Sequence, residues 1–66
     1  MRVAYDRRTD TLSVILRRHV GRPESDEEKS GVILDYDSNG NLISLEILDA
    51  ARRVSDARRV EFQLTE

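Results

Sequence analysis

The chain has 66 residues, fewer than the roughly 100 residues of a typical domain, so its length predicts a single small domain over residues 1–66 and excludes a two-domain protein. Hydrophobic residues make up 38% and charged residues 36%, and there is no cysteine, which excludes a low-complexity chain, a disulfide framework and a thiolate zinc site. The formal net charge of −2 argues against a generally basic nucleic-acid binder, and no apolar run is long enough for a membrane span or a signal peptide, so we expect a cytoplasmic protein without a membrane partner.

The first predicted elements are the two strands of an antiparallel hairpin. Residues 2–5 are compatible with a short strand, and the polar segment 6–10 has the composition of a turn. Between residues 11 and 17, an apolar side chain recurs at every second position from Leu12 onward. This period of two is typical of a strand with one buried face.

The segment from Arg18 to Ser30 interrupts the pattern. Gly21, Pro23 and a run of acidic residues are unfavourable in strand interiors, so the segment is predicted to be an exposed, mobile loop. His19, the only histidine, has no second imidazole or thiol near it in the sequence, and we expect it to be solvated rather than to bind a metal. Charge runs usually form solvated surfaces, but this one is also a candidate site for a protein partner. Its acidic members are Glu24, Asp26, Glu27 and Glu28.

A second antiparallel hairpin is predicted over residues 31–48. Apolar residues alternate in segments 31–36 and 41–48, and the pair Asn39-Gly40 lies between them. An Asn-Gly pair between alternating segments is a strong hairpin signal, because these residues accept the positive φ of a tight turn.

The same segment also matches the pattern of a calcium-binding loop, D-x-[DN]-x-[DN]-G-x5-E. The oxygen ligands of such a loop would come from Asp35, Asp37, Asn39 and Glu46. The helix that should precede the loop is missing from the pattern. If residues 41–46 are extended, Glu46 lies roughly 17–20 Å along the strand from the turn, so the hairpin is favoured over a metal site.

A short helix and a last strand are predicted after residue 48. Asp49 is the candidate N-cap of a helix that either ends at Val54 or continues to Arg59. Apolar and polar residues then alternate over 60–64, which predicts a C-terminal strand.

Two arginine pairs lie in this C-terminal part and are candidates for binding a protein partner. They are Arg52, Arg53, Arg58 and Arg59. Contacts from these residues to phosphates would give weak, salt-dependent nucleic-acid binding. No aromatic side chains are interleaved with the arginines, and the predicted helix is too short for a helix-turn-helix, so the protein partner is favoured.

Four large apolar residues fall on the strand faces opposite the main apolar set, where a half-exposed sheet carries polar residues. They are Ile15, Ile33, Leu42 and Leu48. We expect them to be covered, preferably by the short helix and otherwise by a second subunit. A second subunit would suit a short chain, which buries only about 60% of the surface that it exposes on unfolding.

Several motifs of the chain resemble the domain of unknown function 2283 family of short uncharacterised prokaryotic proteins. The family order is Y-D-x-x-x-D-x-L, an acidic loop, G-V-I-L-D-Y-D-x-x-G and I-E-I-L-x-A. The motifs here are Tyr5-Asp6, Thr9-Asp10-Thr11-Leu12, Gly31-Val32-Ile33-Leu34-Asp35-Tyr36-Asp37, Gly40 and Glu46-Ile47-Leu48-Asp49-Ala50-Ala51. The resemblance implies no established catalytic residues and places Asp35 and Asp37 in a hairpin. Some relatives are thought to lie beside small toxin-like genes, which implies an antitoxin-like role.

Together these patterns predict an α+β fold: a small antiparallel sheet of four or five strands, made of two hairpins and a C-terminal strand, with one short helix packed on it. No arrangement of serine, histidine and carboxylate residues and no phosphate-binding glycine loop marks an active site, so we expect neither catalysis nor a cofactor. We expect an interaction protein, a homodimer, whose acidic loop or arginine-rich end binds a protein partner such as a small toxin-like protein. Calcium binding and weak nucleic-acid binding are the alternative functions.

Overall fold

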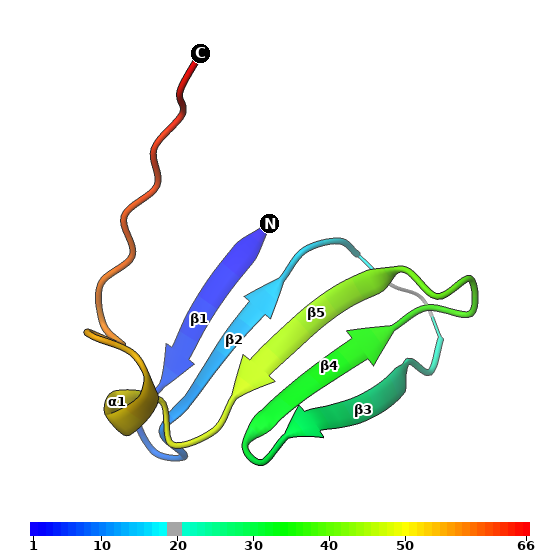
Figure 1. Cartoon of the computed structure of the whole chain (residues 1–66), viewed down its shortest axis with the longest axis horizontal. Helices are drawn as coiled ribbons and strands as arrows, with labels where there is room; N and C mark the ends of the chain where they lie inside the picture. Colours follow the sequence, from blue (N-terminus) through cyan, green and yellow to red (C-terminus); the bar gives the residue numbers. More distant parts are fainter. Residues whose placement is uncertain (19–20) are drawn as a thin grey trace.

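The alternating segments of the sequence form β-strands, because a period of two places every second side chain on the same face of a sheet. A computed structural model describes residues 1–18 and 21–66, and these residues contain five strands and one short helix (Figure 1). His19, which the sequence places in a loop, lies outside the described residues. The elements are β1 (Arg2–Asp6), β2 (Thr11–Ile15), β3 (Glu24–Lys29), β4 (Val32–Tyr36), β5 (Leu42–Ile47) and α1 (Ala50–Arg53).

The five strands form one antiparallel sheet in the order β1-β2-β5-β4-β3. β5 lies at the centre and pairs with β2 on one side and with β4 on the other, so the last strand of the chain joins the N-terminal hairpin to the rest of the sheet. β1 and β3 are the two edges (Figure 1). The predicted α+β class and antiparallel sheet are confirmed, with five strands in the sheet.

The acidic segment forms the edge strand β3, so the prediction of a mobile loop is wrong for residues 24–29. β3 pairs only with β4, and its outer side stays open to water, where charged side chains keep their hydration. Ser30 and Gly31 connect the two strands, and Gly31 has the positive φ, 87°, that this tight turn requires. The register shifts between Glu27 and Lys29, which is a bulge in the edge strand. Pairing with an apolar neighbour has therefore overcome the low strand propensity of this segment.

The hairpin predicted over residues 31–48 is confirmed. β4 and β5 pair along their length, with Leu34 opposite Leu45. In the turn, the Gly40 N–H donates a hydrogen bond to the Asp37 carbonyl at 3.1 Å. Of the Asn-Gly pair only the glycine has a positive φ, 82°, so the turn is closed by a single left-handed residue.

Asp10 joins the first hairpin to α1. Its carboxylate accepts hydrogen bonds from the Tyr5 hydroxyl at 2.6 Å and from the Ala51 backbone N–H at 3.0 Å. Its backbone carbonyl accepts a third from the Ala50 N–H at 2.9 Å. The backbone N–H groups of Ala50 and Ala51 are among those that a helix leaves without partners at its N-terminus. Asp49, the predicted N-cap, makes no side-chain capping bond. Asp10, which precedes Ala51 by 41 positions, caps the helix instead.

The helix is shorter than it must be to cover the sheet. α1 has four residues, and Val54 is its C-cap. Of the two predicted ends, Val54 and Arg59, the structure therefore has the shorter helix. It lies at a corner of the sheet beyond the end of β1 (Figure 1), so the prediction of a helix packed on the sheet is wrong. A single turn presents too few side chains to bury a sheet face, and isolated short helices depend on tertiary contacts such as those from Asp10.

The predicted C-terminal strand is also wrong, because residues 54–66 contain no strand. After α1 this segment runs along the β1 side, and its end lies beyond the sheet (Figure 1). Val60, Phe62 and Leu64 keep their alternation but are 61%, 78% and 81% exposed. The fifth strand of the sheet is therefore β3 and not the C-terminal segment.

We expect the substitution Asp10→Ala to detach α1 from the first hairpin. The hydrogen bond to Asp10, together with burial, raises the pKa of Tyr5 above its usual 10.0. A raised tyrosine pKa stabilises the folded state below pH 10, and this contribution is lost as the pH rises through the raised value. In the variant, absorbance titration should return the pKa of Tyr5 toward 10.0, and the midpoint of thermal unfolding at neutral pH should fall.

The matched control is Asp6→Ala. Asp6 also lies beside this turn, but its carboxylate accepts a hydrogen bond from the Arg8 N–H, at 2.9 Å, and none from Tyr5. This variant should leave the pKa of Tyr5 raised. Equal pKa changes in the two variants would contradict a specific bond to Asp10.

Candidate functional site

One face of the sheet is apolar across its three central strands, and we call it the apolar face. The pairing of β2 with β5 and of β5 with β4 places Val14, Leu45 and Leu34 side by side. The neighbouring row is Leu12, Ile47 and Val32. Directly opposed side chains in antiparallel strands lie roughly 4.5–5.5 Å apart, so the two rows form one continuous patch. The residues of the apolar face are Leu12, Val14, Val32, Leu34, Leu45 and Ile47.

The described residues do not bury the apolar face. All six of its side chains are half-buried, and the buried apolar residues within 1–18 and 21–66 are Ile43, at 4% exposure, and Ala50, at 0%. A contiguous exposed apolar patch of several hundred Å² usually marks a binding surface. The apolar face is therefore the candidate functional site. The sequence predicted its alternation but not that it would stay uncovered, because no local signal reveals the absence of a second layer.

The opposite face mixes apolar and polar side chains. Ile15 and Ile33 lie on it, as predicted, and Ile15, which faces Ser44 across β2 and β5, is 38% exposed. The expectation that the helix covers these residues is wrong, because α1 lies at the corner of the sheet. Leu42 and Leu48, at the two ends of β5, are half-buried.

A carboxylate is buried on this opposite face. Asp35 in β4 is 8% exposed, and one of its oxygens accepts a hydrogen bond from the Ser25 hydroxyl in β3. The other oxygen accepts one from the Ser44 hydroxyl in β5, at 2.7 Å. Both serines lie directly opposite Asp35 in the strand register. Because hydrogen bonds to a charged acceptor are stronger than neutral ones, this cluster ties three neighbouring strands together.

Asp35→Ala should lower the free energy of unfolding by about 2–3 kcal/mol, since hydrogen bonds to charged groups contribute roughly 1.5–3 kcal/mol. Urea denaturation measures this loss. The double variant Asp35→Ala/Ser44→Ala should cost little more than Asp35→Ala alone, because the serine has already lost its acceptor. Fully additive losses would show that the two residues act independently.

The residues of the calcium-loop pattern do not converge on one point. Asp35 is bound by two serines, and Asp37 lies in the turn with Asn39. Glu46 lies along β5, opposite Ile33, and strands rather than helices flank the turn. Within the part of the chain that the structure describes, no group of three or more histidine, cysteine, aspartate or glutamate residues could hold a metal ion. This geometry supports the hairpin interpretation of the motif.

Asp37 closes the turn with its side chain. One carboxylate oxygen accepts hydrogen bonds from the backbone N–H groups of Asn39 and Asn41, both at 2.9 Å, and the other accepts one from the Asn41 side-chain amide at 3.1 Å. These bonds, chiefly that from the Asn41 backbone, hold the pKa of Asp37 below its usual 3.8. Both oxygens therefore serve the hairpin turn.

We expect the stabilising effect of Asp37 to depend on pH. A lowered carboxyl pKa stabilises the folded state in full above the usual value of 3.8, and this contribution is lost as the pH falls through the lower folded value. Urea unfolding of the wild type and Asp37→Ala should differ most at neutral pH and converge below pH 3.8. Asn39→Ala, which keeps the backbone N–H, is the control and should change stability little. A difference that does not vary with pH would contradict a role of the charged carboxylate.

The acidic candidates do not form one patch, because successive residues of a strand point to opposite faces. Glu24 and Asp26 border the apolar face. Glu27 lies on the other face, and its carboxylate accepts a hydrogen bond from the Gly31 N–H at 2.8 Å. Glu28 belongs to β3, but its side chain lies outside the described part of the structure. The acidic run is thus divided between two surfaces.

The arginine candidates are dispersed as well. Arg52 and Arg59 each form an ion pair with a nearby acidic residue, at 3.4 and 2.8 Å, and both pairs are exposed, so they add little stability. Arg53 covers the backbone of Gly31: a Cβ added there would lie 2.6 Å from the Arg53 Nη2. Arg58 donates its backbone N–H to a turn at the base of the C-terminal segment. No single basic patch is formed by these four residues.

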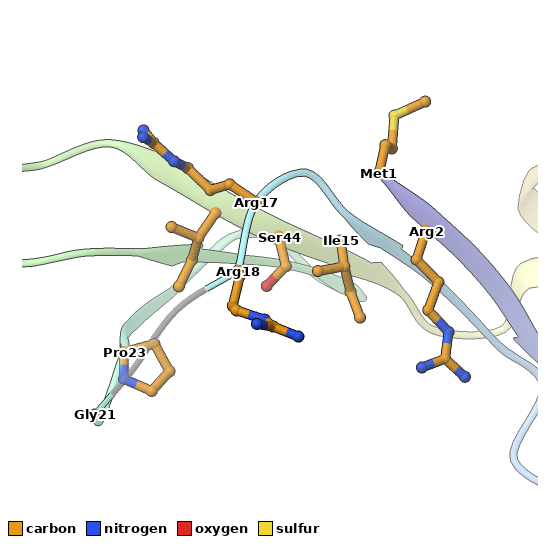
Figure 2. A pocket seen from close by; sticks show the side chains of 9 residues that line it. Met1, Arg2, Ile15, Arg17, Arg18, Gly21, Pro23 and Ser44 are labelled. Atoms are coloured by element: carbon orange, nitrogen blue, oxygen red, sulfur yellow. The ribbon is translucent and has the colours of Figure 1, made fainter.

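A hollow of about 680 Å³ lies on the opposite face, near the end of β2 (Figure 2). The side chains of Arg2 and Arg18 lie on either side of Ile15 there, while Arg17 points away from them (Figure 2). Arg17 and Arg18 are neighbours in the sequence, but nothing in the sequence groups Arg2 with them, because only the pairing of β1 with β2 brings Arg2 beside Ile15. The chain therefore carries a basic surface opposite its apolar one.

Comparison with known proteins gives one match. A family model described as a protein of unknown function (DUF2283) matches residues 2–50, which contain all five strands. The chain matches no curated protein and no solved structure. Within residues 1–18 and 21–66, no helix has the length and apolar character that a membrane crossing needs.

Proposed function

We propose a non-catalytic binding role for this chain, which belongs to the DUF2283 family of proteins of unknown function. Its apolar face binds the same face of a second copy, so that the functional unit is a homodimer with two stacked sheets. The observation that carries the proposal is that all six side chains of the apolar face are only half-buried, and that within the described residues only Ile43 and Ala50 are buried apolar side chains.

Stacking of two sheets is the usual solution for a sheet with one apolar side. Sheets pack face to face about 10 Å apart, with their inner side chains interdigitated. The strands that the structure describes form a single sheet, with no second sheet against it. A second copy supplies the missing layer without any further element of the chain.

We further propose that the dimer binds a protein partner. Arg52, in α1, and its ionic partner Asp49 expose 72% and 64% of their side chains. They would stay accessible in the dimer, where they could bind an acidic surface of a small toxin-like protein in the manner of an antitoxin. Co-purification with the product of an adjacent small gene tests this partner.

Light scattering coupled to size exclusion tests the homodimer, and the wild type should have twice the chain mass of 7.6 kDa. Leu34→Lys places a charge in the centre of the apolar face and should weaken dimerisation at least about 100-fold, from the loss of roughly 2–3 kcal/mol of apolar burial and the cost of an unpaired charge. Ile33→Lys is the matched control, since Ile33 is the next residue of β4 on the opposite face. It should leave the dimer intact.

The thermal unfolding midpoint of the wild type gives a test without any substitution. It should rise with protein concentration, because unfolding of a dimer is coupled to dissociation. A monomer at all concentrations, with a constant unfolding midpoint, would refute the homodimer.

A further inference from the structure

The hollow on the opposite face, near the end of β2, has the size of a small-molecule site. Its volume is about 680 Å³, and ligand pockets have volumes of roughly 300–1,000 Å³. The described residues that line it come from β1, β2, β5 and the segments beside them, and none of these residues is acidic. The hollow therefore combines contributions from three neighbouring strands with an uncompensated positive charge.

Two guanidinium groups flank the hollow without a carboxylate partner. The side chains of Arg2 and Arg18 lie on either side of Ile15 (Figure 2). In the part of the chain that the structure describes, the arginines that form ion pairs are Arg52 and Arg59. Two like charges beside one hollow create a positive potential. A bound anion would neutralise it and would satisfy guanidinium donors that now face water.

Arg17 also borders the hollow but does not add to this pair. Its side chain points away from Arg2 and Arg18 (Figure 2). The pKa of Asp37 is lowered chiefly by the hydrogen bond from the Asn41 backbone, and the positive charge of Arg17 contributes to the same shift. Arg17 therefore acts toward the turn between β4 and β5, and the hollow has two cationic side chains.

The floor of the hollow is apolar. Ile15 is 38% exposed between the two arginines, so its side chain is accessible to a ligand, and Ile43, at 4% exposure, also lines the hollow. The buried carboxylate of Asp35 is not among the lining residues. Both of its oxygens accept hydrogen bonds from the hydroxyls of Ser25 and Ser44. A ligand in the hollow would thus meet apolar surface below and positive charge on two sides.

We propose that this hollow binds a small organic phosphate, with the phosphate group between Arg2 and Arg18 and an apolar body over Ile15. The planar guanidinium group binds phosphate oxygens through paired hydrogen bonds. Two guanidinium groups match the double charge of a phosphate monoester better than the single charge of a carboxylate. The accessible side chain of Ile15 favours an ester with an apolar group over inorganic phosphate.

This site is independent of the proposed homodimer. The hollow and the apolar face lie on opposite sides of the sheet, so stacking of two apolar faces would leave one hollow open on each outer surface. Leu34→Lys, the variant that should weaken dimerisation, should leave phosphate binding unchanged. Loss of the homodimer with retained binding would overturn the proposed function and leave this inference standing.

An NMR titration of the full chain with phenyl phosphate tests the site, at a pH well above the second phosphate pKa of about 6. The backbone amides of Ile15, Ile43 and Ser44 should shift and saturate. Inorganic phosphate, which lacks the apolar body, and benzoate, which has a single charge, should each bind at least about tenfold more weakly. Equal binding of either one would overturn the assigned ligand class, and unchanged amide signals with phenyl phosphate would overturn the site.

Charge-removing variants locate the phosphate group. Arg2→Gln and Arg18→Gln should each weaken the binding of phenyl phosphate at least about tenfold, because each removes charge-assisted hydrogen bonds. Arg7→Gln is the matched control. Arg7 lies in the turn at the other end of β1, roughly 16 Å from Arg2 along the strand, which exceeds the Debye length of about 8 Å at physiological salt. An equal loss in Arg7→Gln would show non-specific attraction to the net charge and overturn the site.

Ile15→Ala tests the apolar part of the same site. It should weaken the binding of phenyl phosphate and leave that of inorganic phosphate unchanged, because only the ester covers this side chain. Ile15 is 38% exposed, so the fold should tolerate the change, and the thermal unfolding midpoint of each variant verifies that it is folded. An equal loss for both ligands, or no loss for either, would overturn the placement of the apolar body over Ile15.

Discussion

A sheet has two faces, and the described residues, 1–18 and 21–66, provide backbone for one layer only. All five strands lie in that layer, and the single helix has four residues and sits at a corner. The six residues of the apolar face are consequently half-buried at best. Hydrophobic burial is the main favourable term in folding, so the stability of this fold depends on what covers the face. The proposed homodimer follows from this one constraint.

Within the sheet, carboxylate side chains hold several backbone segments in place through hydrogen bonds. Asp10 caps α1 from a distant turn, Asp35 binds serines on two neighbouring strands, and Asp37 closes the central hairpin. These residues all lie in the stretch that matches the family model. The pattern that resembles a calcium loop occurs here without convergence of its side chains: both carboxylate oxygens of Asp35 and of Asp37 already accept hydrogen bonds from the protein, and Glu46 lies along β5.

The strands with alternating apolar residues were predictable, and so was the turn at Gly40, because both depend on neighbours in the sequence. β3 was not, since its charged residues have low strand propensity and only the pairing with β4 overcomes it. The partner-binding candidates failed to gather for a related reason. Strand geometry sends Glu24 and Glu27 to opposite faces, and the arginines make separate local contacts: Arg53 lies against Gly31, while Arg52 and Arg59 pair with nearby acidic residues.

The sequence by itself determined which residues share a face of each strand, where the hairpins turn and the α+β class, because periodicity and turn chemistry are local properties. Only the tertiary structure decided the strand order, the edge position of the acidic segment and the capping of α1 by Asp10. Each of these is a contact between segments far apart in the chain. Its free energy depends on which partners are within reach, and no local pattern records that.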